Sequence, residues 1–185
     1  METLIIFIVA LGLSMDCFSL AIVNSAVSGE VKPGISLQAS MAFALAHVLL
    51  MLLGYWVAGL LAGLFAGMEL WAAFIVFVVI GAKMIREAVR RKPEARVFNI
   101  NSGRVILALA VAASIDAFLA GIAFGIVGMR LSLTLVVVAI ATFLFTLSGL
   151  AGGNHFGMEF ARRTGIFGGV FMLITAFHFV AGIVF

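Results

Sequence analysis

Six long apolar segments make up most of this chain and limit what it can fold into. They cover about residues 3–26, 36–62, 69–86, 104–128, 131–156 and 165–185. A helix needs about 20 apolar residues to cross the roughly 30 Å of hydrocarbon in a bilayer. Hydrophobic residues form 65% of the chain and charged residues 10%, against about 45–50% and about 25% in soluble domains. We therefore predict an all-α integral membrane protein with six transmembrane helices.

The distribution of basic residues predicts how these helices are oriented. The connections are short, except for the polar loop 87–103. Six crossings place this loop, Lys32 and the arginine pair at 162–163 on one side of the membrane, and Arg130 on the other. Lys83 lies near the inner end of the third segment, from which its side chain can reach the basic side. Because basic loops stay in the cytoplasm, we expect loop 87–103 to be cytoplasmic and both termini to lie outside.

The two halves of the chain share a motif at a shift of one hundred residues. Each half has three helices, an odd number, so the second half enters the membrane in the opposite direction. Inverted repeats of this kind are typical of transporters, with the binding site between them at the midplane. We predict a first repeat at 1–86 and a second at 104–185, joined by loop 87–103 in one membrane domain. The matching residues are Ser14, Asp16, Phe18, Ile22 and Phe43 with Ser114, Asp116, Phe118, Ile122 and Phe143.

Asp16 and Asp116 each lie near the middle of an apolar segment. A carboxylate at the bilayer centre costs at least about 2.5–3.5 kcal/mol on insertion scales, and such residues generally have a function. The alternative is that each aspartate hydrogen-bonds to a neighbouring helix and only holds the bundle together. We interpret the pair as the two halves of one metal-binding site.

Three other polar side chains are candidate metal ligands at a similar depth. Ser14 and Ser114 lie roughly 160° around a regular helix from the aspartates that follow them. They reach the same ion only where the helix opens, and otherwise they bond to the preceding turn. His47 in the second segment carries an imidazole, which suits many transition metals. The alternative for His47 is a core histidine bonded to one neighbour.

Four further residues are candidates for an ion pathway. Asn24 lies near the inner end of the first segment, and Thr142 and Thr146 share a face of the fifth. Met51 follows His47 by one helical turn, and its thioether favours softer metals. Each of the four could instead pack or cap a helix. Cys17 points roughly 100° away from Asp16, so we interpret it as a small hydrophobic residue.

Several of these motifs resemble one family. They are Ser-Met-Asp-x-Phe at 14–18, Ser-Ile-Asp-Ala at 114–117 and Gly-Ala-Lys-Met-Ile-x-Glu at 81–87. Together with the six-helix inverted repeat, they resemble the MntP-type manganese efflux pumps of bacteria over the whole chain. The resemblance implies export of Mn²⁺ from the cytoplasm across the inner membrane, with Asp16 and Asp116 essential. The chain departs from the family pattern at His47, where the family often has an acidic residue, and at Asn24-Ser25, where it favours glycines.

These features predict a secondary active transporter and not an enzyme. The divalent cation is cargo, so no cofactor is expected. A proton and a metal ion compete for two carboxylates in a dry site, and this competition could couple export to proton entry. Nothing in the chain resembles a nucleotide-binding loop, and the net charge of +3 forms no nucleic-acid patch. We expect the protein to act in the lipid bilayer as a monomer or a homodimer.

Other functions fit some of the same residues. The fold could export another metal ion or a small solute, or the chain could be a membrane subunit that transports nothing. An intramembrane aspartyl protease also uses two aspartates. Its second aspartate usually follows a Gly-x-Gly pattern, whereas the contexts here are Leu-Ser-Met-Asp and Ala-Ser-Ile-Asp.

Overall fold

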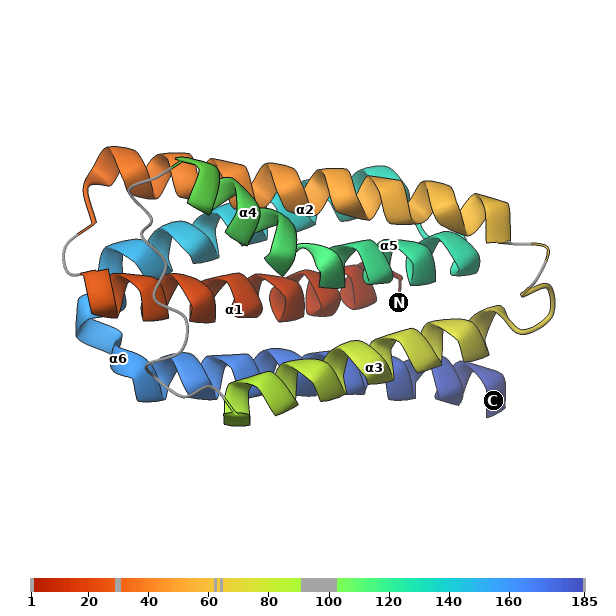
Figure 1. Ribbon diagram of the computed structural model, residues 1–185. Coiled ribbons are helices and arrows are strands. Elements are labelled where there is room, and N and C mark those ends of the chain that lie inside the picture. The colour runs from red at the N-terminus through yellow and green to blue at the C-terminus, as the bar shows by residue number, and fades with distance from the viewer. Residues whose placement is uncertain (1, 29–30, 62, 64, 91–102, 185) are drawn as a thin grey trace.

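The computed structural model describes residues 2–28, 31–61, 63, 65–90 and 103–184, and its regular elements are all helices (Figure 1). The predicted all-α class is therefore confirmed. Most of the predicted loop 87–103 lies outside the described residues. The helices are α1 (Glu2–Ser28), α2 (Pro33–Leu61), α3 (Glu69–Arg90), α4 (Gly103–Ala113), α5 (Ile115–Val127) and α6 (Leu131–Val184).

Two of the predicted segments differ from a single regular helix. The segment predicted at 104–128 is divided at Ser114, which has φ −83° and ψ 0° and separates α4 from α5. The backbone N–H of Ser114 donates to both Ala110 O and Val111 O. In α6, Gly157 has φ 68° and ψ 172°, a backbone conformation that glycine adopts without a steric penalty. The chain reverses there, so α6 forms two antiparallel rods (Figure 1), the second beginning earlier than the predicted residue 165.

Five stretches are long and apolar enough to cross a membrane: Glu2–Ala26, Pro33–Leu61, Gly103–Val127, Leu131–Gly153 and Glu159–Ala181. The chain is therefore a multi-pass membrane protein. The remaining predicted segment, at 69–86, forms α3, which is not among these five and carries Lys83, Arg86 and Glu87 in its second half. α3 nevertheless runs along the bundle beside the other helices (Figure 1).

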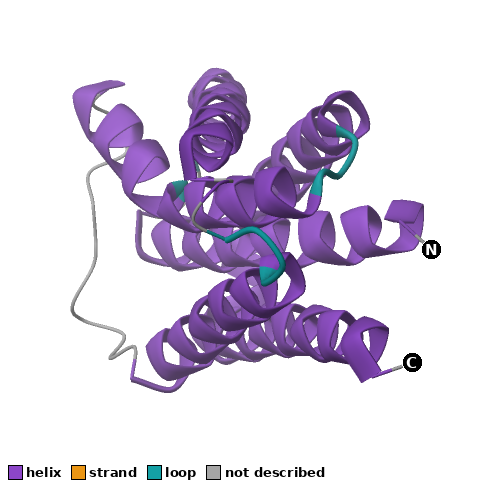
Figure 2. Cartoon of the chain, turned by 90° about the vertical axis from the view of Figure 1, so that its right-hand side faces the viewer, coloured by secondary structure: helices purple, strands orange, loops and turns teal. Residues whose placement is uncertain are grey.

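α1 is the central helix of the bundle (Figures 1 and 2). In its most apolar stretch 72% of the residues are buried, against 33–44% in the other four spans. α2, α4 and α5 lie on one side of it, and α3 with the second rod of α6 lies on the other. Phe77 of α3 stacks on Phe179 of α6 with ring centroids 5.6 Å apart, and it also contacts Phe124 of α5. These aromatic contacts hold α3, α5 and the second rod of α6 together.

Glycines allow two helix pairs to approach closely at this depth. A Cβ added to Gly54 of α2 would lie 2.1 Å from Phe118 O of α5, and one added to Gly121 of α5 would lie 2.2 Å from Met51 O of α2. A Cβ on Gly149 of α6 would lie 3.0 Å from Phe18 O of α1. Small residues permit such backbone contact between membrane helices. These contacts fix α5 against α2 and α6 against α1.

Candidate functional site

Asp116 lies in the first turn of α5, directly after the break at Ser114. Its side chain is 4% exposed, and its Oδ1 accepts a hydrogen bond from the Lys83 ammonium of α3. An ionised carboxylate in an apolar interior requires such a partner, because the cost of removing it from water is otherwise uncompensated. The break after Ala113 and the approach of α3 together position this ion pair.

Lys83 is the residue of this site that the sequence analysis missed. Its side chain is 31% exposed and turns inward to Asp116, not along the helix to the membrane surface as the sequence suggested. Asp16 and Glu87 also act electrostatically on both members of the pair. A basic residue inside an apolar segment usually has a partner there, and that rule was the available signal.

Asp16 lies on α1, and its side chain is partly buried. It belongs to the same electrostatic group as Asp116, Lys83 and Glu87. α1, α3 and α5 therefore bring three acidic groups and one basic group together in the bundle. The two aspartates of the sequence motif are among them.

His47 lies at the contact of α2 with α1 and with the break between α4 and α5. Its Nδ1 is 2.7 Å from Ser114 Oγ and 3.1 Å from Phe43 O, and its Nε2 is 3.4 Å from Cys17 Sγ. Ser114 Oγ also donates to Ala110 O at 2.7 Å. His47 and Cys17 are 1% and 0% exposed. Cys17 is thus more than the small hydrophobic residue that the sequence suggested, because its sulfur contacts the imidazole.

Two other predicted residues have simpler surroundings. Ser14 Oγ donates to Leu11 O at 3.0 Å, the local bond that the sequence offered as the alternative to metal binding. Met51 is 1% exposed and belongs to the main apolar core. Its backbone carbonyl abuts Gly121, so α2 and α5 are in direct backbone contact one turn from His47.

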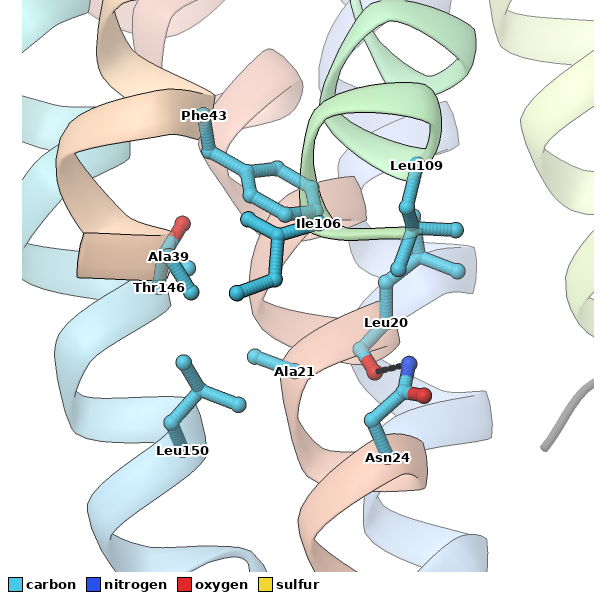
Figure 3. A pocket seen from close by; sticks show the side chains of 9 residues that line it. All are labelled: Leu20, Ala21, Asn24, Ala39, Phe43, Ile106, Leu109, Thr146 and Leu150. Atoms are coloured by element: carbon cyan, nitrogen blue, oxygen red, sulfur yellow. Dashed lines mark hydrogen bonds between the residues drawn. The ribbon is translucent and has the colours of Figure 1, made fainter. Parts of the chain in front are cut away.

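Asn24 and Thr146 line one pocket between α1, α2, α4 and α6, whose other lining side chains are apolar (Figure 3). Asn24 Nδ2 donates to Leu20 O at 2.9 Å. Within the described part of the chain, Asn24 Oδ1, Thr146 Oγ1 and the nearby Thr142 Oγ1 are buried without a hydrogen-bond partner.

The hydroxyls of Thr142 and Thr146 lack the hydrogen bond that the other threonines of α6 form. Thr134, Thr164 and Thr175 each donate to the carbonyl four residues earlier. Threonine hydroxyls commonly form this bond in helices, but those of Thr142 and Thr146 do not. The predicted pathway residues therefore offer three buried oxygen atoms that have no hydrogen-bond partner among the residues that the structure describes.

The described residues hold no cluster of three or more His, Cys, Asp or Glu side chains placed to bind one metal ion. Asp116 instead forms an ion pair with Lys83, and the imidazole of His47 contacts Cys17 Sγ and Ser114 Oγ. Four of the five predicted metal ligands thus lie in two neighbouring groups: Asp16 and Asp116 in an acidic group with Lys83, and His47 and Ser114 in a second group with Cys17. Both lie where the break at Ser114 meets α1.

Comparison with known sequences places the chain among membrane transporters. The profile of a family described as "Putative manganese efflux pump" matches residues 30–180. The chain belongs to this family. The family's described activity is transport and not an enzymatic reaction.

Relatives match over nearly the full length. The chain is 31% identical to the "Putative manganese efflux pump MntP" of Methanothermobacter thermautotrophicus, over 94% of this chain and 93% of the relative. It is 30% identical to the protein of the same description from Ruminiclostridium cellulolyticum, over 91% of this chain and 89% of the relative. No solved structure matches the chain.

Proposed function

We propose that the protein exports divalent manganese from the cytoplasm across the inner membrane, through a site formed by Asp16 and Asp116. Family membership supports the cargo. The observation that carries the site is that Asp16 and Asp116, one hundred residues apart, act electrostatically on one another in the bundle, where Asp116 is buried and Asp16 partly buried. Mn²⁺ favours oxygen ligands, and two carboxylates supply two negative charges for a divalent ion.

In this proposal Lys83 compensates Asp116 while no metal is bound. Its ammonium donates to the carboxylate that the metal would bind, so cargo and Lys83 exclude one another. Glu87 lies one helical turn further along α3 and already acts on Lys83. Glu87 can pair with the Lys83 ammonium when the Asp116 carboxylate binds a metal ion. With three carboxylates and one ammonium, the group has a formal charge of −2 without cargo, and a divalent cation neutralises it.

Ser14, Ser114 and His47 are the proposed neutral ligands. The two serine hydroxyls donate their hydrogens to backbone carbonyls, but each oxygen keeps lone pairs that can face a cation. Waters complete the coordination of the ion. The proposed route to the site passes Asn24, Thr146 and Thr142, whose unpartnered oxygens can replace part of the hydration shell.

Inverted repeats remain our proposal for the architecture. α2 ends and α4 begins at opposite ends of the bundle, so α3 supplies the sixth crossing (Figure 1). The contacts of the glycines add support: Gly149 abuts Phe18 O, and Gly54 abuts Phe118 O. Phe18 and Phe118 are equivalent in the repeat, so each half receives a glycine from the other at the same position. Rocking of the halves about the site would alternate access, with proton entry as the driving force.

The orientation follows the basic residues, as the sequence predicts. The cytoplasmic side would hold loop 87–103 and the entrance near Asn24, and both termini would lie outside. The start of α1 and the end of α6 lie at the same end of the bundle (Figure 1), which supports an even number of crossings.

The function is tested with inside-out vesicles or proteoliposomes that accumulate Mn²⁺ when a pH gradient is imposed. Wild-type protein should drive uptake. Asp16→Asn and Asp116→Asn keep nearly the same shape and should each abolish it. Ser19→Ala is the matched control for loss of a buried polar group near Asp16 on α1, because Ser19 Oγ donates to Ala161 O of α6. Uptake by either aspartate variant at the wild-type rate would refute the proposed site.

A further inference from the structure

The hydrogen bonds around His47 determine which of its ring nitrogens carries the proton. Ser114 Oγ donates its only hydrogen to Ala110 O, so it must accept at the 2.7 Å contact with His47 Nδ1. Phe43 O, 3.1 Å from the same nitrogen, can only accept. Nδ1 therefore carries the hydrogen, and Nε2 presents its lone pair to Cys17 Sγ at 3.4 Å.

We propose that His47 Nε2 and Cys17 Sγ are a pair of donors for a thiophilic divalent metal ion, such as Zn²⁺ or Co²⁺. This inference rests on the proposed export function and deepens it by naming a second class of cargo. The sulfur and the imidazole nitrogen are the soft and borderline donors that select such ions over Mn²⁺.

The distance between the two donor atoms fits a chelated ion. Zinc–sulfur bonds of about 2.3 Å and zinc–nitrogen bonds of about 2.0–2.1 Å, held at a near-tetrahedral angle, place sulfur and nitrogen about 3.3–3.6 Å apart. The observed separation is 3.4 Å. The two donor atoms are thus already at the separation that a chelated ion requires.

The anchoring of the imidazole also matches that of a metal ligand. A metal-binding histidine usually donates its other ring N–H to a carbonyl or another acceptor, which fixes the orientation of the ring. His47 Nδ1–H has two such acceptors, Phe43 O and Ser114 Oγ. The same serine lies two residues before Asp116, so the thiol–imidazole pair adjoins the acidic group.

Binding at this pair requires loss of the thiol proton, since the thiolate is the ligand. His47 Nε2 bonds to the metal and cannot take that proton, so it passes to water that enters with the ion. No third His, Cys, Asp or Glu of the described residues completes a cluster here. Two protein donors with water suit an ion in transit, because a transport site must also release its cargo.

The test uses Co²⁺ as a spectroscopic probe of the purified full-length protein in detergent. Coordination of Co²⁺ by sulfur gives a charge-transfer absorption in the near ultraviolet, and Cys17 is the only cysteine. Wild-type protein and the Ser19→Ala control should show this band, and Cys17→Ser should not. Cys17→Ser retains a hydrogen-bond donor toward His47, so a purely structural thiol would leave the metal spectrum unchanged.

Metal affinities provide the second measurement. Cys17→Ser and His47→Gln should each weaken Zn²⁺ binding at least about tenfold. Cys17 is not among the proposed Mn²⁺ ligands, so Cys17→Ser should leave Mn²⁺ binding unchanged. Absence of the sulfur band from wild-type protein, or equal Zn²⁺ affinities in all variants, would overturn the inference. Neither result bears on the proposed Mn²⁺ site. That site is tested separately, by Mn²⁺ uptake with Asp16→Asn and Asp116→Asn.

Discussion

Replacing Lys83 by methionine should destabilise the protein, because it leaves the Asp116 carboxylate buried without its cation. The Asp116 side chain is 4% exposed and that of Lys83 is 31% exposed. Removing one partner of a fully buried ion pair costs about 3–5 kcal/mol. Because part of Lys83 reaches solvent, which screens the pair, we expect Lys83→Met to lower the free energy of unfolding by about 2–3 kcal/mol.

The reverse change should cost less. In Asp116→Leu the lysine keeps its partial exposure and the nearby Glu87, so it can be solvated. The double variant Lys83→Met/Asp116→Leu removes both charges and should recover most of the stability lost in Lys83→Met, since apolar replacement of a buried pair is often neutral. It should remain unable to transport metal, which separates the structural role of the pair from its function.

These stabilities are measured as free energies of unfolding in detergent micelles, by titration with denaturing detergent and circular dichroism. Lys32→Met, at an exposed residue directly before α2, is the control for loss of one positive charge. Wild-type stability of Lys83→Met would refute the reasoning. The reasoning would also be refuted if the double variant lost as much free energy of unfolding as the two single variants lose together.

The remaining predictions concern packing and the ion pathway. Gly54→Ala should lower the free energy of unfolding by about 1–3 kcal/mol, because its Cβ would lie 2.1 Å from Phe118 O. Gly59→Ala on the same helix has nothing within 4 Å of its Cβ and should raise it by up to about 1 kcal/mol; equal effects would contradict the α2–α5 packing. Thr146→Val should keep or increase stability, since it removes a buried unpartnered hydroxyl, while Mn²⁺ flux falls about tenfold, or about 1.4 kcal/mol. Full flux would exclude Thr146 from the pathway, and a loss of stability would show that its hydroxyl is bonded.

The fold class followed from the sequence because hydropathy alone determines how much of a chain must lie in lipid. Five of the six predicted segments form stretches able to span a membrane. The predicted segment 69–86 also forms a helix, α3, but it is not among the stretches able to span a membrane, and its second half is charged. The residues at which two of the predicted helices are interrupted were not predictable. The interruption at Ser114 has no proline or glycine at its position, and the contact of its hydroxyl with His47 comes from a helix distant in the sequence.

The site was predictable in part. The repeated motif identified Asp16 and Asp116 because intramembrane carboxylates are costly. Their inclusion with Lys83 and Glu87 in one electrostatic group depends on how α1, α3 and α5 pack, which the periodicity of one helix does not encode. The same holds for Cys17: its angle from Asp16 was assessed on α1 alone, whereas its contact with His47 is set by α2.

Equilibrium binding of Mn²⁺ to the purified protein tests the central claim most directly. If Asp16 and Asp116 are two halves of one site, wild-type protein should bind one ion per chain there. Asp16→Asn and Asp116→Asn should then each weaken that binding at least about 100-fold. Retention of one ion per chain at wild-type affinity by either variant would contradict the account.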